Sequence, residues 1–185
     1  VLRGGVIRPG DTMEIIPRQG KRPYQAAVIT LSDKGSRGER IDESGPMIAQ
    51  TLQERGYDVV ETLLLPDGEE ELKRQLMRLT DQRQLDLILT TGGTGLSPRD
   101  VTPEATLAVA TRLVPGIAEA MRSASLTITK RAMLSRAVSV IRGKTLIINL
   151  PGSPKACREC MAVFLDTIPH GMDLLRGDAG DCAVK

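Results

Sequence analysis

Two glycine-rich segments have the residue types of anion-binding loops. Residues 90–97 read Thr-Thr-Gly-Gly-Thr-Gly-Leu-Ser and follow a short run with the apolar residues Leu85, Leu87, Ile88 and Leu89. Residues 151–155 read Pro-Gly-Ser-Pro-Lys and follow the apolar run 145–150. Glycines let a backbone approach a ligand closely, and the free amides at the start of a helix attract phosphate. Each pattern alone is also typical of an ordinary strand-to-helix turn, but the two together favour a shared phosphate site.

Signals for the start of a helix lie after the first glycine-rich segment and within the second. Thr102 is a candidate N-cap before Pro103, and Ser153 is a candidate N-cap before Pro154. Lys155 adds a positive charge beside the second start. In an α/β fold, both helix starts would lie at the edge of the sheet where ligands bind.

Two aspartates stand where they could hold a divalent cation. Asp100 follows Arg99 just after the first glycine-rich segment, and Asp67 follows the predicted strand 59–65 in the sequence Pro-Asp-Gly. If the strands are parallel, both carboxylates reach the same edge of the sheet, and carboxylate oxygens are ligands that suit Mg²⁺. The alternative for Asp67 is an ordinary turn residue or helix cap, because Pro-Asp-Gly is a common turn sequence.

The elements that must position these residues alternate between strand and helix patterns. The apolar run 26–31 predicts a first strand, and Ser32 and Asp33 follow it where α/β folds place ligands. The pattern 44–55 predicts a helix that ends at Gly56. The other predicted helices are 69–79, 103–113, 117–126 and 154–165, and the other predicted strands are 59–65, 85–89, 137–141 and 145–150. The short connection between the last two strands predicts a hairpin and therefore an antiparallel edge.

Composition limits the classes of protein. The chain has 185 residues, which suits one domain with a sizeable core. Its net charge is +2 with acids and bases interspersed, which argues against a strongly electrostatic nucleic-acid binder. No apolar run reaches membrane-spanning length. Three cysteines, at positions 157, 160 and 182, favour a reduced, cytoplasmic protein, and the pair Cys157 and Cys160 is better explained as buried helix residues than as half of a metal site.

Three motifs resemble the MoaB/Mog family of molybdopterin adenylyltransferases. They are residues 90–106, residues 133–136 (Met-Leu-Ser-Arg) and residues 146–156. The resemblance covers about residues 25–176 and implies a three-layer α/β/α fold with a mostly parallel, doubly wound sheet and an antiparallel edge strand. Within the second motif, Ser135 and Arg136 are either near a site or a polar helix end.

The resemblance implies adenylyl transfer from ATP to the terminal phosphate of molybdopterin, with Mg²⁺, releasing pyrophosphate. The family's two acidic site residues map onto Asp67 and Asp100, which become the catalytic and metal-binding candidates. The attacking phosphate is largely ionised near neutral pH because its second pKa is about 6, so no strong general base is required. The implied ligand-binding residues are Ser32, Asp33, Gly92, Gly93, Thr94, Gly95, Ser97, Arg99, Pro151, Gly152, Ser153 and Lys155.

The resemblance also implies a homotrimer or higher homo-oligomer, and a molybdenum-insertion enzyme as a partner. Residues 1–24 read as an extension or linker, and part of them resembles the last hairpin of a MOSC domain, which would then be a further partner. Residues 25–176 form the molybdopterin-binding domain in this division, and residues 177–185 form a tail.

Three alternatives stay open at this point. Molybdenum-insertion enzymes of the MoeA type share the fold, but they usually carry further domains and a different loop after Gly-Gly. CinA-type proteins share a Thr-Gly-Gly loop, but they resemble Gly-Leu-Gly-Pro rather than the Gly-Thr-Gly-Leu-Ser-Pro-Arg-Asp of residues 93–100. The third alternative is a module that binds or scaffolds molybdopterin without turnover.

Overall fold

The computed structural model describes residues 8–12 and 21–177. Its centre is a six-stranded sheet with the order β2-β1-β3-β6-β5-β4. Strands β2, β1, β3 and β6 run parallel, and the pairs β6–β5 and β5–β4 are antiparallel. The strands are β1 (Gln25–Leu31), β2 (Asp58–Leu65), β3 (Leu87–Thr91), β4 (Arg112–Leu113), β5 (Ser139–Arg142) and β6 (Thr145–Leu150). The predicted fold class and the antiparallel edge are confirmed.

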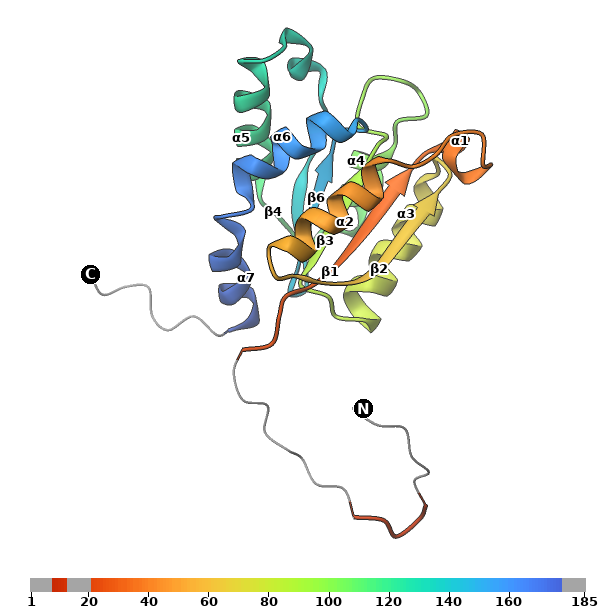
Figure 1. Ribbon diagram of the computed structural model, residues 1–185, viewed down its shortest axis with the longest axis vertical. Coiled ribbons are helices and arrows are strands. Elements are labelled where there is room, and N and C mark those ends of the chain that lie inside the picture. Colours follow the sequence, from red (N-terminus) through yellow and green to blue (C-terminus); the bar gives the residue numbers. More distant parts are fainter. Residues whose placement is uncertain (1–7, 13–20, 178–185) are drawn as a thin grey trace, which may run out of the picture.

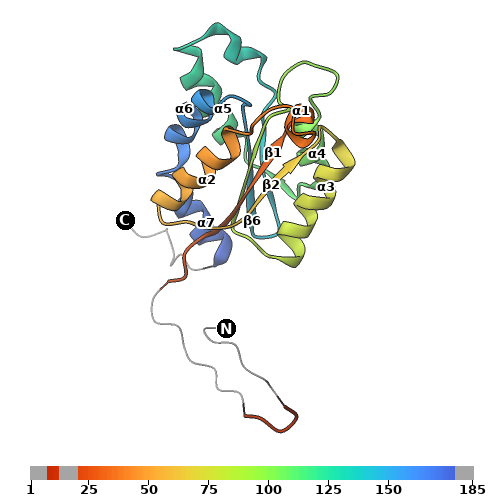
Figure 2. The same cartoon turned by 45° about the vertical axis from the view of Figure 1, so that its right-hand side comes forward.

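Helices cover both faces of the sheet and produce three layers (Figure 2). Helices α2, α5, α6 and α7 pack on one face, and α3 and α4 pack on the other. The helices are α1 (Asp33–Ser36), α2 (Ser44–Glu54), α3 (Glu69–Met77), α4 (Thr102–Val109), α5 (Pro115–Leu126), α6 (Pro154–Phe164) and α7 (Ile168–Arg176), with the short turns η1 (Arg78–Gln82) and η2 (Lys130–Leu134).

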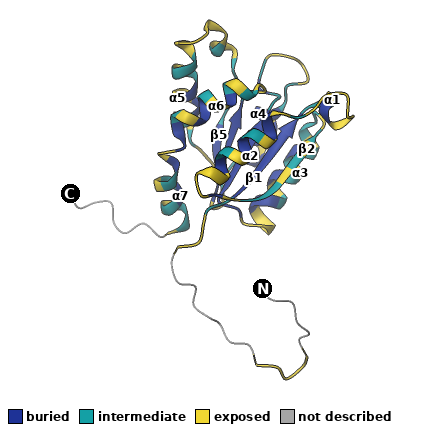
Figure 3. Ribbon diagram, viewed as in Figure 1, coloured by how far each residue is buried: buried dark blue, intermediate teal, exposed yellow. Residues whose placement is uncertain are grey.

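The central strands are buried almost completely (Figure 3). Every residue of β3 and β6 is buried, because helices cover both faces of these strands. The two layers of the core are mainly aliphatic, as a chain with one Phe and no Trp requires. Cys157 and Cys160 are free, buried residues of α6, which agrees with the interpretation as buried helix residues.

The prediction of a helix over 103–113 was wrong at its end. Helix α4 stops at Val109, and Arg112–Leu113 pairs with β5 as the edge strand β4. Pro115 lies in the first turn of α5, so it starts that helix and does not only end the one before. The pairing partner of β4 is far away in sequence, so a local pattern could not reveal it.

The predictions for the chain ends lie mostly outside the described residues. These are the extension over residues 1–24 with its MOSC-like hairpin, of which only residues 8–12 and 21–24 are described, and the tail beyond residue 177. No helix of the described chain is long and apolar enough to cross a membrane.

Candidate active site

The carboxyl ends of four neighbouring strands bring the predicted site residues to one edge of the sheet. Strands β2, β1, β3 and β6 are parallel neighbours, so the loops that follow them emerge together. Figure 1 shows α1 and the loop between β3 and α4 at this end of the molecule. In open α/β sheets, ligands bind at this edge.

Asp33 and Asp67 hold each other in place through their backbones. The amide N–H of Asp33 donates to Asp67 Oδ2 at 3.1 Å, and the amide N–H of Asp67 donates to Asp33 Oδ1 at 3.1 Å. Asp67 therefore does not cap α3, whose N-cap position is Gly68 and has no side-chain cap bond. The carboxylate of Asp67 is fixed by the neighbouring loop instead.

The first glycine loop bends so sharply that side chains would not fit. Gly92 and Gly93 have φ angles of +95° and +62°, a region that favours glycine. A Cβ on Gly93 would overlap Thr102 Oγ1 and would lie 3.7 Å from Asp67 Oδ1. The loop thus passes close beside the Asp67 carboxylate.

Asp100 borders the same loop from its other end. The amide N–H of Ser97 donates to Asp100 Oδ2 at 2.9 Å, and a Cβ on Gly95 would lie 2.9 Å from that oxygen. The charge of Asp100 is also one of the causes that raise the pKa of Asp67. The structure therefore places both aspartates beside the segment from Gly93 to Gly95, at one edge of the sheet.

The acidic cluster contains three carboxylates and one nearby cation. Arg99 Nη2 lies 2.5 Å from Asp33 Oδ2, while Asp33 itself bonds to Asp67. Burial raises the pKa of Asp67, and the charges of Asp33 and Asp100 raise it further, whereas the amide of Asp33 and the charge of Arg99 lower it. The net direction is upward, as expected where negative charges crowd together and a further cation would be favourable.

The second glycine loop meets the first. Ser153 Oγ accepts from the amide of Ala156 at 3.2 Å and caps α6, and Pro154 is in the first turn, so both predictions are confirmed. A Cβ on Gly152 would lie 3.5 Å from Gly92 Cα, and Pro151 O accepts from Thr91 Oγ1 at 2.6 Å. The starts of α4 and α6 therefore flank one site from opposite faces of the sheet.

One residue near the loops differs from the sequence interpretation. Thr102 is not the N-cap of α4, because the cap position is Val101 and the Thr102 hydroxyl donates to Gly92 O at 2.9 Å. This bond stabilises the loop rather than the helix start. Lys155 lies in the first turn of α6 with an 82% exposed side chain, 3.8 Å from Glu159, and its role in binding phosphate stays a prediction.

Arg136 is the main support of the first loop, a role that the sequence reasoning left open. Its Nε donates to Gly95 O at 2.7 Å, its Nη2 donates to Asp100 O, and its Nη1 pairs with Glu104. Its own amide donates to Thr94 O at 2.9 Å. One guanidinium thus ties the Gly95 and Asp100 ends of the loop together.

Two cavities adjoin the loops. One, of about 150 Å³, lies between the end of β1, the start of α2 and the glycines Gly92 and Gly152. The other, of about 290 Å³, is more apolar and lies between the first loop, α5, η2 and α6, with Thr94 and Ser135 in its wall. The two glycine loops therefore contribute to the walls of two cavities of different polarity.

The donor set fits Mg²⁺. In the described part of the chain, no group of three or more His, Cys, Asp or Glu side chains is arranged to hold a metal ion. Mg²⁺ is usually bound by one or two carboxylates together with substrate phosphates and water, so it does not need such a group. Asp67 and Asp100 each use Oδ2 for a backbone amide, which leaves each Oδ1 available as a hard oxygen ligand.

Comparison with known proteins agrees with this geometry. Residues 27–170 match the family described as "Probable molybdopterin binding domain". The chain is 41% identical over 153 residues to a molybdopterin adenylyltransferase of Helicobacter pylori, covering 82% of this chain and 87% of the relative. It is 45% identical over 152 residues to one of Haemophilus influenzae, covering 81% and 76%.

Solved structures of related proteins share the fold. The molybdopterin biosynthesis enzyme MoaB from Thermus thermophilus superposes with a TM-score of 0.79 at 47% identity, covering 83% of this chain and 97% of that one. The Mog protein from Mycobacterium ulcerans also gives 0.79, at 39% identity, with coverages of 85% and 99%. A CinA protein from Thermoplasma acidophilum, at 18% identity and a TM-score of 0.58, shares the fold alone. The chain belongs to the MoaB/Mog family of molybdopterin-binding proteins.

Proposed function

We propose that this protein is a molybdopterin adenylyltransferase of molybdenum cofactor biosynthesis. In the reaction, an oxygen of the terminal phosphate of molybdopterin attacks the α-phosphorus of ATP. The bond between the α- and β-phosphates breaks, and pyrophosphate leaves. The attacking phosphate is already an anion near neutral pH, since its second pKa is about 6. The protein must therefore align two anions and neutralise their charge, and it needs no strong base.

The observation that supports this function is the meeting of two glycine loops and two aspartates at one edge of the sheet. Amides of the first loop and the amide of Lys155 at the start of α6 can donate to phosphate oxygens, and Gly92, Gly93 and Gly152 allow close approach. Curated relatives that share about two fifths of their residues with this chain are named molybdopterin adenylyltransferase. The residues inferred to bind the substrates are those of the three loops after β1, β3 and β6.

Asp67 and Asp100 would hold Mg²⁺ through their available oxygens. When bound, the ion would neutralise charge on the phosphates. Asp33 has a different task in this proposal, because it fixes the Asp67 carboxylate through reciprocal backbone bonds. Arg99 would balance the remaining charge and could turn toward a phosphate, since its side chain is 64% exposed.

The assembly and partners follow the family resemblance. We infer a homotrimer, supported by exposed apolar side chains outside the candidate site, such as Leu113 on β4 and Ile128 and Met133 near η2. We also infer that a molybdenum-insertion enzyme takes the adenylylated product, that residues 1–24 are an N-terminal extension or linker related to a MOSC domain, and that the domain itself spans 25–176. Use of ATP and free thiols at Cys157 and Cys160 support a cytoplasmic location.

A single assay separates the enzyme from a module that only binds. The protein is incubated with ATP, Mg²⁺ and molybdopterin, and pyrophosphate is measured. We expect stoichiometric pyrophosphate and adenylylated molybdopterin, and no pyrophosphate when either Mg²⁺ or molybdopterin is left out. Tight binding of molybdopterin without release of pyrophosphate would instead assign the protein a binding or scaffolding role.

A further inference from the structure

One fully buried side-chain amide joins four segments of the chain. Asn149 of β6 is 0% exposed, and its Nδ2 donates to Thr90 Oγ1 of β3 at 2.9 Å and to Thr106 Oγ1 of α4 at 3.0 Å. Its Oδ1 accepts from the amide of Val138, just before β5, at 3.3 Å. Both amide hydrogens and the carbonyl oxygen of this side chain therefore have partners.

These bonds of Asn149 lie directly before the two glycine loops. Thr90 and Asn149 are partners in the register of β3 and β6, and each is the last residue but one of its strand. The first loop reaches Gly92 two residues after Thr90, and the second begins at Pro151, two residues after Asn149. The bond between the two side chains therefore helps to hold the starts of the two loops at a fixed separation.

Helix α4 is attached to the sheet by two buried threonines. Thr102 and Thr106 are four residues apart, so they lie on the same side of the helix. Thr102 donates to Gly92 O at 2.9 Å, and Thr106 accepts from Asn149. The other buried residues of α4 are Pro103, Ala105 and Val109. No buried side chain of this helix is larger than valine, so its apolar contacts form a shallow surface that resists sliding only weakly.

The position of α4 along its axis influences where Asp100 lies, because this aspartate stands two residues before the helix. A buried amide with all its bonds made adds little net stability compared with an apolar side chain, but its bonds are directional and favour one arrangement. We propose that Asn149 is a positioning residue for adenylyl transfer. It holds α4 through Thr106 and so keeps Asp100 beside the first glycine loop. The inference rests on the proposed function and adds a fully buried residue that acts without touching either substrate.

Two substitutions of Thr106 separate the hydrogen bond from the packing. Thr106→Val keeps the shape of the side chain and removes the oxygen that accepts from Asn149, whereas Thr106→Ser keeps the oxygen and removes a methyl group. We expect Thr106→Val to lower kcat for pyrophosphate release about tenfold, with KM for ATP and molybdopterin within about twofold of wild type, because small displacements of reacting groups slow the chemistry. Thr106→Ser should keep kcat within about twofold of wild type, although it should melt at a lower temperature.

A double-mutant cycle tests Asn149 itself. Asn149→Leu replaces the amide with an apolar side chain of similar shape, and it should lower kcat at least as much as Thr106→Val does. Because both residues act through the same bond, the double variant Asn149→Leu/Thr106→Val should be no slower than Asn149→Leu alone. In the double variant two apolar side chains face each other, so it should melt no lower than Asn149→Leu.

Thr145→Val is the matched control. Thr145 lies on the same strand as Asn149 but at the end opposite the site, is 1% exposed and donates to Leu85 O. The substitution removes a buried hydroxyl of the same kind, so it should lower the melting temperature. It should leave kcat and both KM values unchanged.

A spectroscopic readout follows the position of Asp100 without any substrate. The amide N–H of Ser97 donates to Asp100 Oδ2, so its signal in a proton–nitrogen NMR spectrum of the whole protein reports where that carboxylate lies. The signal should move in Thr106→Val and in Asn149→Leu. It should stay in place in Thr106→Ser and in Thr145→Val.

Three kinetic results would overturn the proposal: full kcat in Thr106→Val, an equal loss of kcat in Thr106→Ser and Thr106→Val, or additive losses in the double-mutant cycle. An unmoved Ser97 signal in Thr106→Val would do so as well. Failure of the proposed function is distinct, because the wild type would then release no pyrophosphate. In that case the Ser97 signal would still decide whether Asn149 positions Asp100.

Discussion

The carboxylate of Asp67 is ionised at a cost to the stability of the empty protein. Burial raises its pKa, and the charges of Asp33 and Asp100 add to the effect. Because the pKa in the folded state is above that in the unfolded state, folding favours the protonated form. The protein gains stability as pH falls toward this pKa and loses it when the group ionises. A carboxylate in this condition is poised to bind a cation.

Substituting asparagine at position 67 or 100 should therefore reduce activity without reducing the stability of the fold. We expect Asp67→Asn and Asp100→Asn to keep the fold and to lower pyrophosphate release by roughly 100-fold or more, because the substrate phosphates lose a charge-neutralising ligand. At pH 7, Asp67→Asn should melt at the wild-type temperature or above, and any difference should shrink as pH falls. Added Mg²⁺ should raise the melting temperature of the wild type more than that of the variant.

Asp58 offers a control for these substitutions. It is an exposed aspartate at the start of β2, at the opposite end of the strand from Asp67, and it accepts a bond from Gln25 Nε2 at 3.2 Å. Asp58→Asn should change neither activity nor the response to Mg²⁺. A fully active Asp100→Asn protein would contradict the role of that residue as a metal ligand and charge-neutralising group.

At the scale of elements, the loop between β3 and α4 depends on an arginine from another part of the chain. Arg136 reaches the carbonyls of Gly95 and Asp100, so it fixes the two ends of the segment that carries Asp100. A displacement of about 1 Å at a reacting group can lower a rate by roughly 100-fold. We expect Arg136→Ala to lower kcat by about 10- to 100-fold with a smaller change in KM for ATP. Guanidinium ion added to the Ala variant should restore part of kcat.

Arg142 provides a comparable side chain at the other end of the sheet. It bonds to Val109 O at 2.9 Å and to both carboxylate oxygens of Asp81. Arg142→Ala should lower the melting temperature about as much as Arg136→Ala does, but it should leave kcat unchanged. If both variants lost activity only in proportion to stability, and guanidinium rescued neither, Arg136 would be a purely structural residue.

The elements show which features of the fold and site a sequence can predict. Local signals were sufficient for β1, β3, β6, the cap at Ser153 and the turn at Gly92, because each depends on residues close together in the chain. The contact between Asp33 and Asp67 could not be predicted, since it requires β1 and β2 to be neighbours. The same reason explains the failures at Thr102 and at the end of α4, where loop and edge-strand partners decided the outcome.

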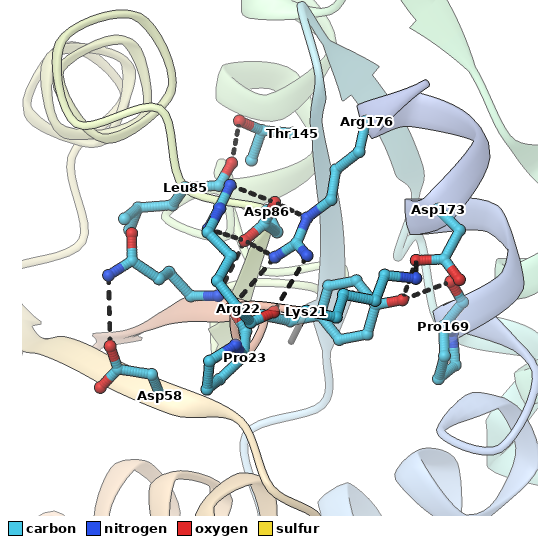
Figure 4. Close-up of polar contacts among 12 residues, drawn as sticks. Lys21, Arg22, Pro23, Asp58, Leu85, Asp86, Thr145, Pro169, Asp173 and Arg176 are labelled. Atoms are coloured by element: carbon cyan, nitrogen blue, oxygen red, sulfur yellow. Dashed lines mark hydrogen bonds and ion pairs between the residues drawn. The ribbon is translucent and has the colours of Figure 1, made fainter. Parts of the chain in front are cut away.

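At the scale of the whole molecule, an ionic cluster lies at the end of the sheet opposite the candidate site (Figure 4). Asp86, at the base of β3, accepts bonds from Arg176 of α7, from Arg22 and from the amide of Gln25. The side chains of Asp86 and Arg176 are only 5% and 7% exposed. The cluster therefore ties the segment before β1 and the last described helix to the centre of the sheet.

This cluster makes stability sensitive to acid without involving the site. Burial alone would raise the pKa of Asp86, but the bonds from Arg176 and Gln25 and the nearby arginine charges bring it below its usual range. With a lower pKa in the folded state, the stabilisation is present at neutral pH and is lost as pH falls through that pKa. The site residue Asp67 has the opposite dependence, so the two ends of the molecule respond to pH in opposite directions.

Removing the charge of Asp86 should lower the stability of the fold and leave the catalytic activity unchanged. Asp86→Asn takes the carboxylate away from the buried guanidinium of Arg176, a change that typically costs roughly 3–5 kcal/mol, or about 10 °C in a chain of this size. We expect pyrophosphate release below the melting range to stay at the wild-type level. Lys21→Gln, which removes a half-exposed partner of Asp173, should cost less than about 1 kcal/mol. If Asp86→Asn and the wild type had the same melting temperature, the cluster would not stabilise the fold. If the variant lost activity at low temperature, the cluster would not be independent of the candidate site.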